Sequence, residues 1–302
     1  MTIFLQQLIN GLSLGALYGL IAVGYTVVYG IVKLINFAHG EIFMAGAFGA
    51  LTVYLLMGSP EHVGVGFGLG VMLPLMVAGG MLVSVGLALL MERFAYRPLR
   101  NAPRLAPLIS AIGISIALQE IFRLFYGRIP GFPDAHSAIR FPTVDGISGR
   151  SITLGGVEIQ MPAVFTLGAL AICTGFLWWF VNRTRSGRAM LATSQDPDTA
   201  SLMGVDVDRV IMIAFALGAA LAAVAGVAHG LRYANIDFRM GFVAGMKAFT
   251  AAVLGGIGNI NGAVLGGLVL GMAEPMATTY IPGQFGGAAW KDVWAFVILI
   301  LV

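Results

Sequence analysis

Long apolar runs separated by short polar segments dominate the pattern of the chain. Runs with at most two charged residues cover residues 3–32, 42–57, 63–91, 105–126, 162–181 and 210–231. A membrane-spanning helix needs about 20 mostly apolar residues, so these runs predict spans. Together with the shorter runs that follow, they predict an all-α fold, a polytopic transmembrane helix bundle of about seven to nine spans.

The pattern becomes irregular after residue 231. Runs at residues 243–258 and 262–273 are short for a span and flank the glycine-rich residues 255–262 (GGIGNING), and a last helix is expected from residue 290. Non-helical backbone at membrane depth persists only where it is buried in protein or lines water. The glycine-rich residues therefore form either a broken or re-entrant segment of the bundle or an ordinary tight turn between two short helices.

Arginine residues orient the predicted bundle, because cytoplasmic loops carry an excess of basic residues. Residues 92–104 hold four arginines against one acid, and residues 182–209 carry arginines at both ends, so both segments are expected in the cytoplasm. Residues 127–161 balance three arginines with three acids and are expected to form an external loop. Within this loop, residues 152–159 alternate around a Gly-Gly pair, which predicts a small β-hairpin.

No shift in composition divides the chain, so residues 1–302 are expected to form a single transmembrane domain. The parity of the spans places the N-terminus outside and the C-terminus inside. If the first run folds back on itself, the N-terminus moves inside. No lysine or arginine precedes Lys33, which argues against a cleaved signal peptide.

Composition excludes several classes of protein. The chain is 58% hydrophobic and 10% charged, whereas a soluble domain averages about 45–50% and about 25%. A soluble chain with so few charges would expose large apolar patches, which excludes a soluble enzyme, a disordered chain and a nucleic-acid binder. The 42 glycines predict closely packed helices. The single Cys173 leaves no disulfide framework or thiolate metal site.

The sequence lacks the motifs of a nucleotide-binding P-loop and of a zinc-dependent hydrolase. A phosphate-binding P-loop needs a Gly-Lys pair, and the chain has none. It also lacks His-Glu-x-x-His. We therefore expect no enzyme, and ATP-driven transport would require a separate ATPase chain.

Two polar segments are candidate parts of a solute pathway. Asn36, His39 and Glu41 fall between apolar runs, where ionisable groups either face a cavity or belong to a short hydrated cytoplasmic turn. Asn259 and Asn261 lie in the glycine-rich segment, and broken helices near the middle of a bundle are where transporters bind solutes.

A third segment predicts a short cytoplasmic helix. Asp196 is a favourable N-cap, Pro197 suits the first helical position, and Gly204 ends the helix. Its Ala200, Leu202 and Met203 are apolar. Such a helix either seats in a groove of a partner protein or lies flat on the bilayer.

Two further acids are expected to be buried, Glu120 within a predicted span and Glu274 directly after the run at residues 262–273. Glu120 precedes Arg123 by three residues, so a same-face ion pair is expected rather than a proton relay.

Four segments resemble the permease subunits of branched-chain amino-acid ABC importers, a group that also includes urea-type permeases. They are residues 36–41 (NFAHGE), 92–100 (ERFAYRPLR), 187–205 (GRAMLATSQDPDTASLMGV) and 255–263 (GGIGNINGA). Their order and spacing agree over nearly the whole chain. The resemblance implies a multi-pass permease of the bacterial inner membrane.

The resemblance also implies several partners. A second homologous permease subunit, or a copy of this chain, would complete the pathway in the lipid bilayer, with no nucleic acid involved. Two cytoplasmic ATPase subunits would hold ATP and Mg, so that this chain carries no cofactor and no metal. A periplasmic solute-binding protein would deliver the solute, facing the external loop unless that loop is a passive connector.

A short coupling helix of each such permease seats in an ATPase groove, and residues 182–209 match that region. The residues expected to take part in coupling are Arg188, Asp196, Asp198, Ala200, Leu202, Met203 and Gly204. Since the family usually continues past its last span, a C-terminal tail beyond Val302 is expected.

The expected mechanism is alternating access driven by ATP binding to the partner subunits. The expected solute is a branched-chain or other hydrophobic amino acid. Asn36, Asn259 and Asn261 are expected to line the pathway, with His39 and Glu41 nearer the cytoplasmic gate. Alternatives are a urea or short-amide importer, or an ATPase-independent channel or carrier with a proton site at one of the two acids described above.

Overall fold

The computed structural model describes residues 2–59, 64–100, 102–103 and 105–301. Val63, Arg104 and Val302, which border predicted segments, lie outside the described residues. The helices are α1 (Thr2–Val32), α2 (His39–Leu56), α3 (Val65–Phe67), α4 (Leu73–Met91), α5 (Leu105–Phe125), α6 (Met161–Arg183), α7 (Arg185–Gln195), α8 (Pro197–Leu202), α9 (Val207–Tyr233), α10 (Met240–Leu254), α11 (Ile260–Tyr280) and α12 (Lys291–Leu301).

Short 3-10 or π-helical turns and strands complete the structure. The turns are η1 (Gly68–Met72), η2 (Glu92–Tyr96), η3 (Arg97–Leu99), η4 (Tyr126–Arg128), η5 (Gly283–Phe285) and η6 (Ala288–Trp290). The strands are β1 (Ile139–Arg140), β2 (Ser151–Leu154), β3 (Val157–Gln160) and β4 (Asn235–Ile236), paired as β1–β4 and β2–β3.

Seven helical segments in the described part of the chain are long and apolar enough to cross a membrane. They are α1, α2, the continuous segment Val65–Leu99, the segment Leu105–Arg128, α6, α9 and α11. The apolar helix α10 is shorter, at 15 residues. The prediction of an all-α polytopic bundle is confirmed, with spans at the lower end of the expected range.

The basic segment after α4 differs from its prediction. A cytoplasmic loop is expected at residues 92–104, whereas the chain continues from α4 through η2 and η3 to Leu99. Arginine indicates the side of the membrane, but it is also a good helix former. The buried side chains of Glu92 and Tyr96 hold these extra turns against the bundle.

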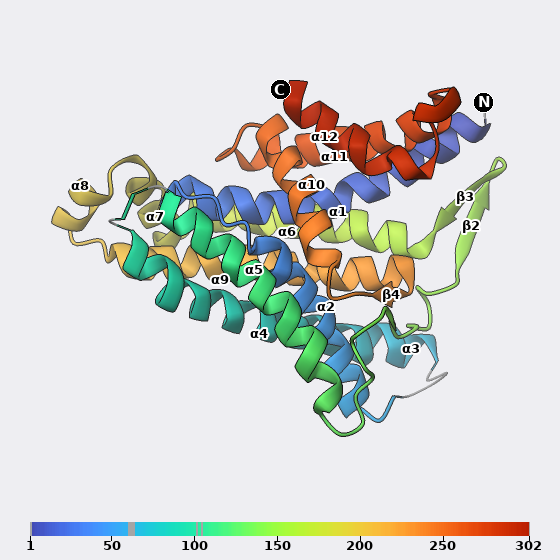
Figure 1. Cartoon of the computed structure of the whole chain (residues 1–302), viewed down its shortest axis with the longest axis horizontal. Helices are drawn as coiled ribbons and strands as arrows, with labels where there is room; N and C mark the ends of the chain where they lie inside the picture. The colour runs from blue at the N-terminus through green and yellow to red at the C-terminus, as the bar shows by residue number, and fades with distance from the viewer. Residues whose placement is uncertain (1, 60–63, 101, 104, 302) are drawn as a thin grey trace.

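The long axis of the molecule has two distinct ends. α7 and α8 lie at one end, and the β2–β3 hairpin lies with the N-terminus at the other (Figure 1). We call them the α8 end and the hairpin end. Gln6 Nε2 donates to the Glu158 carbonyl at 2.9 Å, and Glu158 N donates to Gln6 Oε1 at 2.8 Å. These bonds hold the start of α1 against the hairpin.

The predicted hairpin is confirmed. Leu154 pairs with Val157 across Gly155 and Gly156, whose φ angles are 58° and 83°. A two-residue turn with two positive φ angles matches the twist of the flanking strands, and glycine adopts it without strain.

The centre of the bundle is formed by α1, α2 and α9, which are largely buried, whereas α5 and α6 are largely exposed. Glycines bring α1 and α11 into backbone contact. A Cβ atom added to Gly271 would lie 2.1 Å from Gly15 Cα, and one added to Gly267 would lie 2.5 Å from Gly19 Cα. The high glycine content thus serves close helix packing, as the sequence predicts.

Candidate functional site

The second helix begins inside the bundle. Non-helical residues 33–38 lead from α1 to His39, the first residue of α2. His39 packs against Gly24, since a Cβ atom added there would lie 2.5 Å from His39 Nε2. Val32 is the last residue of α1, and Gly24 lies about 12 Å back along the helix axis from it, at a rise of about 1.5 Å per residue. The start of α2 is therefore well inside the helical layer.

The three polar residues of this segment are buried. Asn36, His39 and Glu41 are each no more than 3% exposed. The alternative of a hydrated cytoplasmic turn is wrong for these residues. Gly24 of α1 and Gly218 of α9 both pack against His39, since a Cβ atom added to Gly24 or Gly218 would lie 2.5 Å or 3.5 Å from its ring.

Glu41 is the centre of a buried polar cluster between α2 and α5. Its Oε1 accepts hydrogen bonds from Ser115 Oγ at 2.9 Å and from Gln119 Nε2 at 2.8 Å. Its Oε2 has no hydrogen-bond partner among the described residues. Ser115 and Gln119 are four residues apart and so share one face of α5, a signal that sequence reasoning missed.

The first turn of α2 also meets the first turn of α10. A Cβ atom added to Gly40 would lie 2.2 Å from the Gly241 carbonyl oxygen, and one added to Gly241 would lie 2.5 Å from Glu41 Oε2. Two helix N-termini, each with a positive dipole end, therefore lie beside the free oxygen of a buried carboxyl group.

Asn259 and Asn261 lie elsewhere. Asn259 caps α11 by accepting a hydrogen bond from Gly262 N at 3.2 Å, and both asparagines are exposed. The turn lies beside the end of α1, because a Cβ atom added to Gly30 would approach Gly258 Cα at 3.9 Å. Gly241 and this turn are separated by about 20 Å of α10. The structure thus does not bring the two asparagines to the Glu41 cluster.

The predicted short helix is α8. Asp196 Oδ1 accepts from Asp198 N and Thr199 N, both at 3.0 Å, and Gly204 follows the helix with a φ of 85°. These observations confirm the predicted start and stop.

The apolar residues of α8 divide into two groups. Leu202 and Met203 are 87% and 81% exposed. Ala200, by contrast, is only 5% exposed, so it packs inward rather than facing a partner. Arg188 and Asp198, also expected to take part in coupling, are exposed. The protruding surface therefore consists of Leu202 and Met203, which we call the α8 tip.

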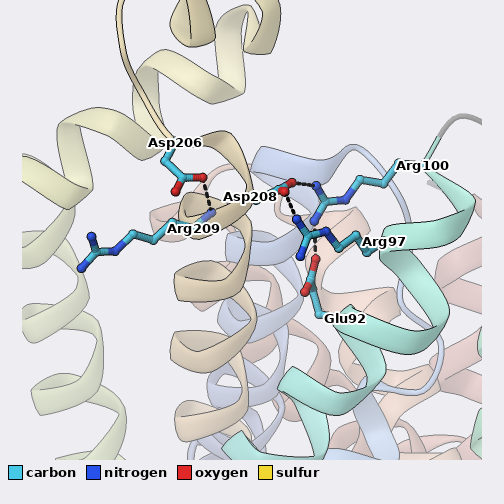
Figure 2. A network of polar contacts seen from close by, with 6 residues as sticks. All are labelled: Glu92, Arg97, Arg100, Asp206, Asp208 and Arg209. Atoms are coloured by element: carbon cyan, nitrogen blue, oxygen red, sulfur yellow. Dashed lines mark hydrogen bonds and ion pairs between the residues drawn. The ribbon is translucent and has the colours of Figure 1, made fainter.

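Charged side chains join α9 to the turns after α4. Asp208, in the first turn of α9, forms ion pairs with Arg97 and Arg100, and Arg100 also pairs with Glu92. Figure 2 shows these groups converging from η2, η3 and α9, with the neighbouring Asp206 turned toward the backbone of Arg209. This network was not predicted, although Glu92, Arg97 and Arg100 fall in a segment that carried the resemblance.

The two acids of the spans have partners. Arg123 Nε donates to Glu120 Oε2 at 2.8 Å, which confirms the predicted pair. Glu274 accepts from Lys247 Nζ at 2.9 Å and from Tyr18 Oη at 2.9 Å. Lys247, which sequence reasoning missed, neutralises the buried carboxylate.

Comparison with known proteins identifies the family. The family model described as "Branched-chain amino acid transport system / permease component" matches residues 7–302. The chain belongs to this permease family. All four segments that carried the resemblance lie within the matched residues, so that prediction is confirmed.

Individual relatives agree with the family match. This permease is 43% identical, over 304 residues, to the high-affinity branched-chain amino acid transport system permease protein LivH of Escherichia coli, covering 99% of this chain and 92% of the relative. It is 43% identical over 309 residues to BraD of Pseudomonas aeruginosa, which has the same descriptive name, with the same coverage. The probable LivH of Methanocaldococcus jannaschii is 27% identical over 290 residues.

Family membership gives the permease a general role. It is a multi-pass membrane subunit of a transport system. Permeases of ABC importers generally act with ATPase and binding-protein subunits, so the α8 tip and the hairpin end are the surfaces to examine for such partners.

Proposed function

We propose that this permease forms the translocation pathway of an ATP-driven importer for branched-chain or other hydrophobic amino acids. The observation that carries the proposal is the α8 tip, where Leu202 and Met203 protrude from a capped helix at one end of the molecule. Exposed apolar side chains on a short helix suit a groove in a partner protein. The names of the relatives support the choice of solute.

The partners follow from the same proposal. The α8 tip seats in one of two cytoplasmic ATPase subunits, which hold the ATP and Mg that this chain does not bind. A second homologous permease, or a copy of this chain, completes the pathway in the bacterial inner membrane. A periplasmic binding protein docks at the hairpin end, on the loop at residues 127–161. No nucleic acid takes part.

The pathway requires groups that recognise a zwitterion. An α-amino acid carries an ammonium group that needs an acceptor and a carboxylate that needs donors. Glu41 Oε2 is an acceptor without a hydrogen-bond partner among the described residues. The adjoining N-termini of α2 and α10 favour a negative charge. We assign these elements to a binding region for the backbone of the solute.

Glu41 is fully buried in the described conformation. A solute would reach it only after a conformational change, which alternating access provides. Asn36 and His39 flank it at the start of α2. Asn259 and Asn261 are proposed to line the exit near the α8 end. The few polar groups are consistent with a permease that leaves solute selection to its binding protein.

Variants of the α8 tip test this function. Replacement of Leu202 and Met203 by Asp should abolish leucine uptake and retention of the ATPase subunits during purification, with membrane insertion unchanged. The exchange Leu202→Met with Met203→Leu keeps an apolar tip of the same composition and should preserve both. Undiminished ATPase retention by the Asp variant would contradict the assignment of α8.

An ATPase-independent carrier is the alternative from another class. Its proton site was expected at Glu120 or Glu274, but Glu120 is paired with Arg123 and Glu274 with Lys247. A urea or short-amide importer would use the same machinery with a different solute. Binding assays on the partner binding protein separate that cargo from amino acids.

A further inference from the structure

Hydrogen bonds connect the α8 helix to the start of α9. The buried Ala200 accepts a backbone hydrogen bond from Val205 N at 3.0 Å, which folds the chain back immediately after the helix. Asp206 then caps α9 by accepting from Arg209 N at 3.0 Å. With both bends fixed by hydrogen bonds, a displacement of α8 also displaces the first turn of α9.

From α9 the contacts continue to the turns after α4. Asp208 binds Arg97 and Arg100, and Arg100 reaches Glu92 (Figure 2). The Glu92 side chain is only 1% exposed, whereas that of Arg97 is 41% exposed. Arg100 is therefore the cation that connects α9 to a buried group, while the Arg97 pair is solvated and contributes less.

The η2 turn connects this ion network to the start of α2. Glu92 and Tyr96 are the two ends of a single π-helical turn, an irregularity found frequently at functional sites. Tyr96 is buried and donates from Oη to Asn36 Oδ1 at 2.8 Å. The Asn36 carbonyl in turn accepts from His39 N at 3.0 Å, at the first residue of α2.

We propose that Glu92, Tyr96, Arg100 and Asp208 are positioning residues that transmit movement of α8 to the first turn of α2. Tyr96 contacts Asn36, which flanks the proposed solute site, and the other three residues act through Tyr96. They join the ATPase-docking end of the permease to the segment that carries Asn36 and Glu41. The inference rests on the proposed function for the role of α8, and it adds the route by which ATPase closure reaches the pathway.

The test uses the assembled importer, with its partner permease, ATPases and binding protein, reconstituted in liposomes with L-leucine. The measured quantity is the number of ATP molecules hydrolysed per leucine imported. Tyr96→Phe removes only the hydroxyl group and should raise this ratio roughly two- to ten-fold, the range that one net hydrogen bond controls. ATPase retention and basal hydrolysis should stay at the wild-type level.

A matched control and a double-mutant cycle separate transmission from general destabilisation. Tyr126 lies in η4, directly after α5, and its hydroxyl is 3.2 Å from Thr52 Oγ1. Tyr126→Phe removes this hydroxyl and should keep the wild-type ratio. Asp208→Asn should raise the ratio as Tyr96→Phe does. If the two residues act in one route, the double variant should resemble the more impaired single variant, because their effects are not independent.

A second, milder variant guards against failed folding. Arg100→Lys keeps the charge but cannot span both acids as a planar guanidinium does, and it should also raise the ratio. Wild-type ratios in both Tyr96→Phe and Arg100→Lys would overturn the inference, as would strictly additive effects in the cycle. Failure of the unmodified importer to take up leucine would instead contradict the proposed function.

Discussion

The ion cluster around Lys247 offers a direct test of how this bundle is stabilised. Lys247 Nζ lies 2.9 Å from Glu274 Oε1, 3.1 Å from Tyr18 Oη and 2.6 Å from Asp292 Oδ1. The side chains of Lys247 and Glu274 are only 4% and 7% exposed, whereas that of Asp292 is 42% exposed. The cluster ties α1, α10, α11 and α12 together around one buried cation.

Lys247→Met removes the cation and leaves the Glu274 carboxylate buried, with only the Tyr18 hydroxyl as its donor. Breaking a buried pair in this way costs about 3–5 kcal/mol, because the remaining charge is uncompensated. Asp292 is exposed enough to regain water and adds little to this cost. At roughly 2–4 °C per kcal/mol, the unfolding midpoint should fall by about 6–20 °C.

The assay is the temperature at which half of the detergent-purified permease is lost from the monodisperse peak. The double variant Lys247→Met with Glu274→Gln leaves no buried charge and keeps a partner for Tyr18, so it should recover most of the lost stability. If the single variant is as stable as wild type, or the double variant is less stable than both single variants, the buried pair does not have the assigned role.

Three smaller predictions concern packing and caps. Gly271→Ala places a Cβ atom 2.1 Å from backbone atoms of α1 and should reduce the yield of folded permease, whereas Gly113→Ala, with no atom within 4 Å, should not. Asn259→Leu removes the α11 cap at a cost of about 0.5–2 kcal/mol. A complete loss of uptake by a variant that is still folded would favour a pathway role for Asn259, whereas wild-type uptake would leave Asn259 with its capping role alone. A hydrogen bond from the Thr199 hydroxyl lowers the pKa of Asp196. The stability that this cap gives α8 is therefore fully present above the ordinary aspartate pKa of about 3.9 and is lost as the pH falls through the lowered pKa. Amide hydrogen exchange of α8, measured as a function of pH, should report this loss.

Local sequence signals predicted the local features well. The spans follow from apolar runs, and the start of α8 follows from Asp196 and Pro197, because cap chemistry acts within a few residues. The hairpin follows from alternation around Gly155 and Gly156. Each of these features depends on neighbours in the sequence, so one chain is sufficient to predict it.

Contacts between residues far apart in the sequence could not be predicted from these local signals. Glu41 meets Ser115 and Gln119 across more than 70 residues of chain, at separations of 74 and 78. Lys247 falls in an apolar run and shows its role only when α10 packs against α11. The depth at which α2 begins depends on the path of residues 33–38, which no local pattern specifies.

Two errors have a common cause. The extra helical turns after α4 and the inward packing of Ala200 both reflect burial against α9 or its neighbours. The predictions instead treated residues 92–104 as a cytoplasmic loop and placed Ala200 on a helix face that meets a partner or the bilayer. Charge and exposure inferred from composition predict only the side of the membrane. They do not give the face that a residue presents.

Uptake of L-leucine into liposomes that contain the purified permease pair, with and without the ATPase subunits, tests the central claim most directly. With the binding protein and ATP present, the account predicts uptake only when the ATPase subunits are included, and none when the Leu202→Asp, Met203→Asp chain replaces the wild type. Leucine entering down its gradient through the permeases alone would contradict it.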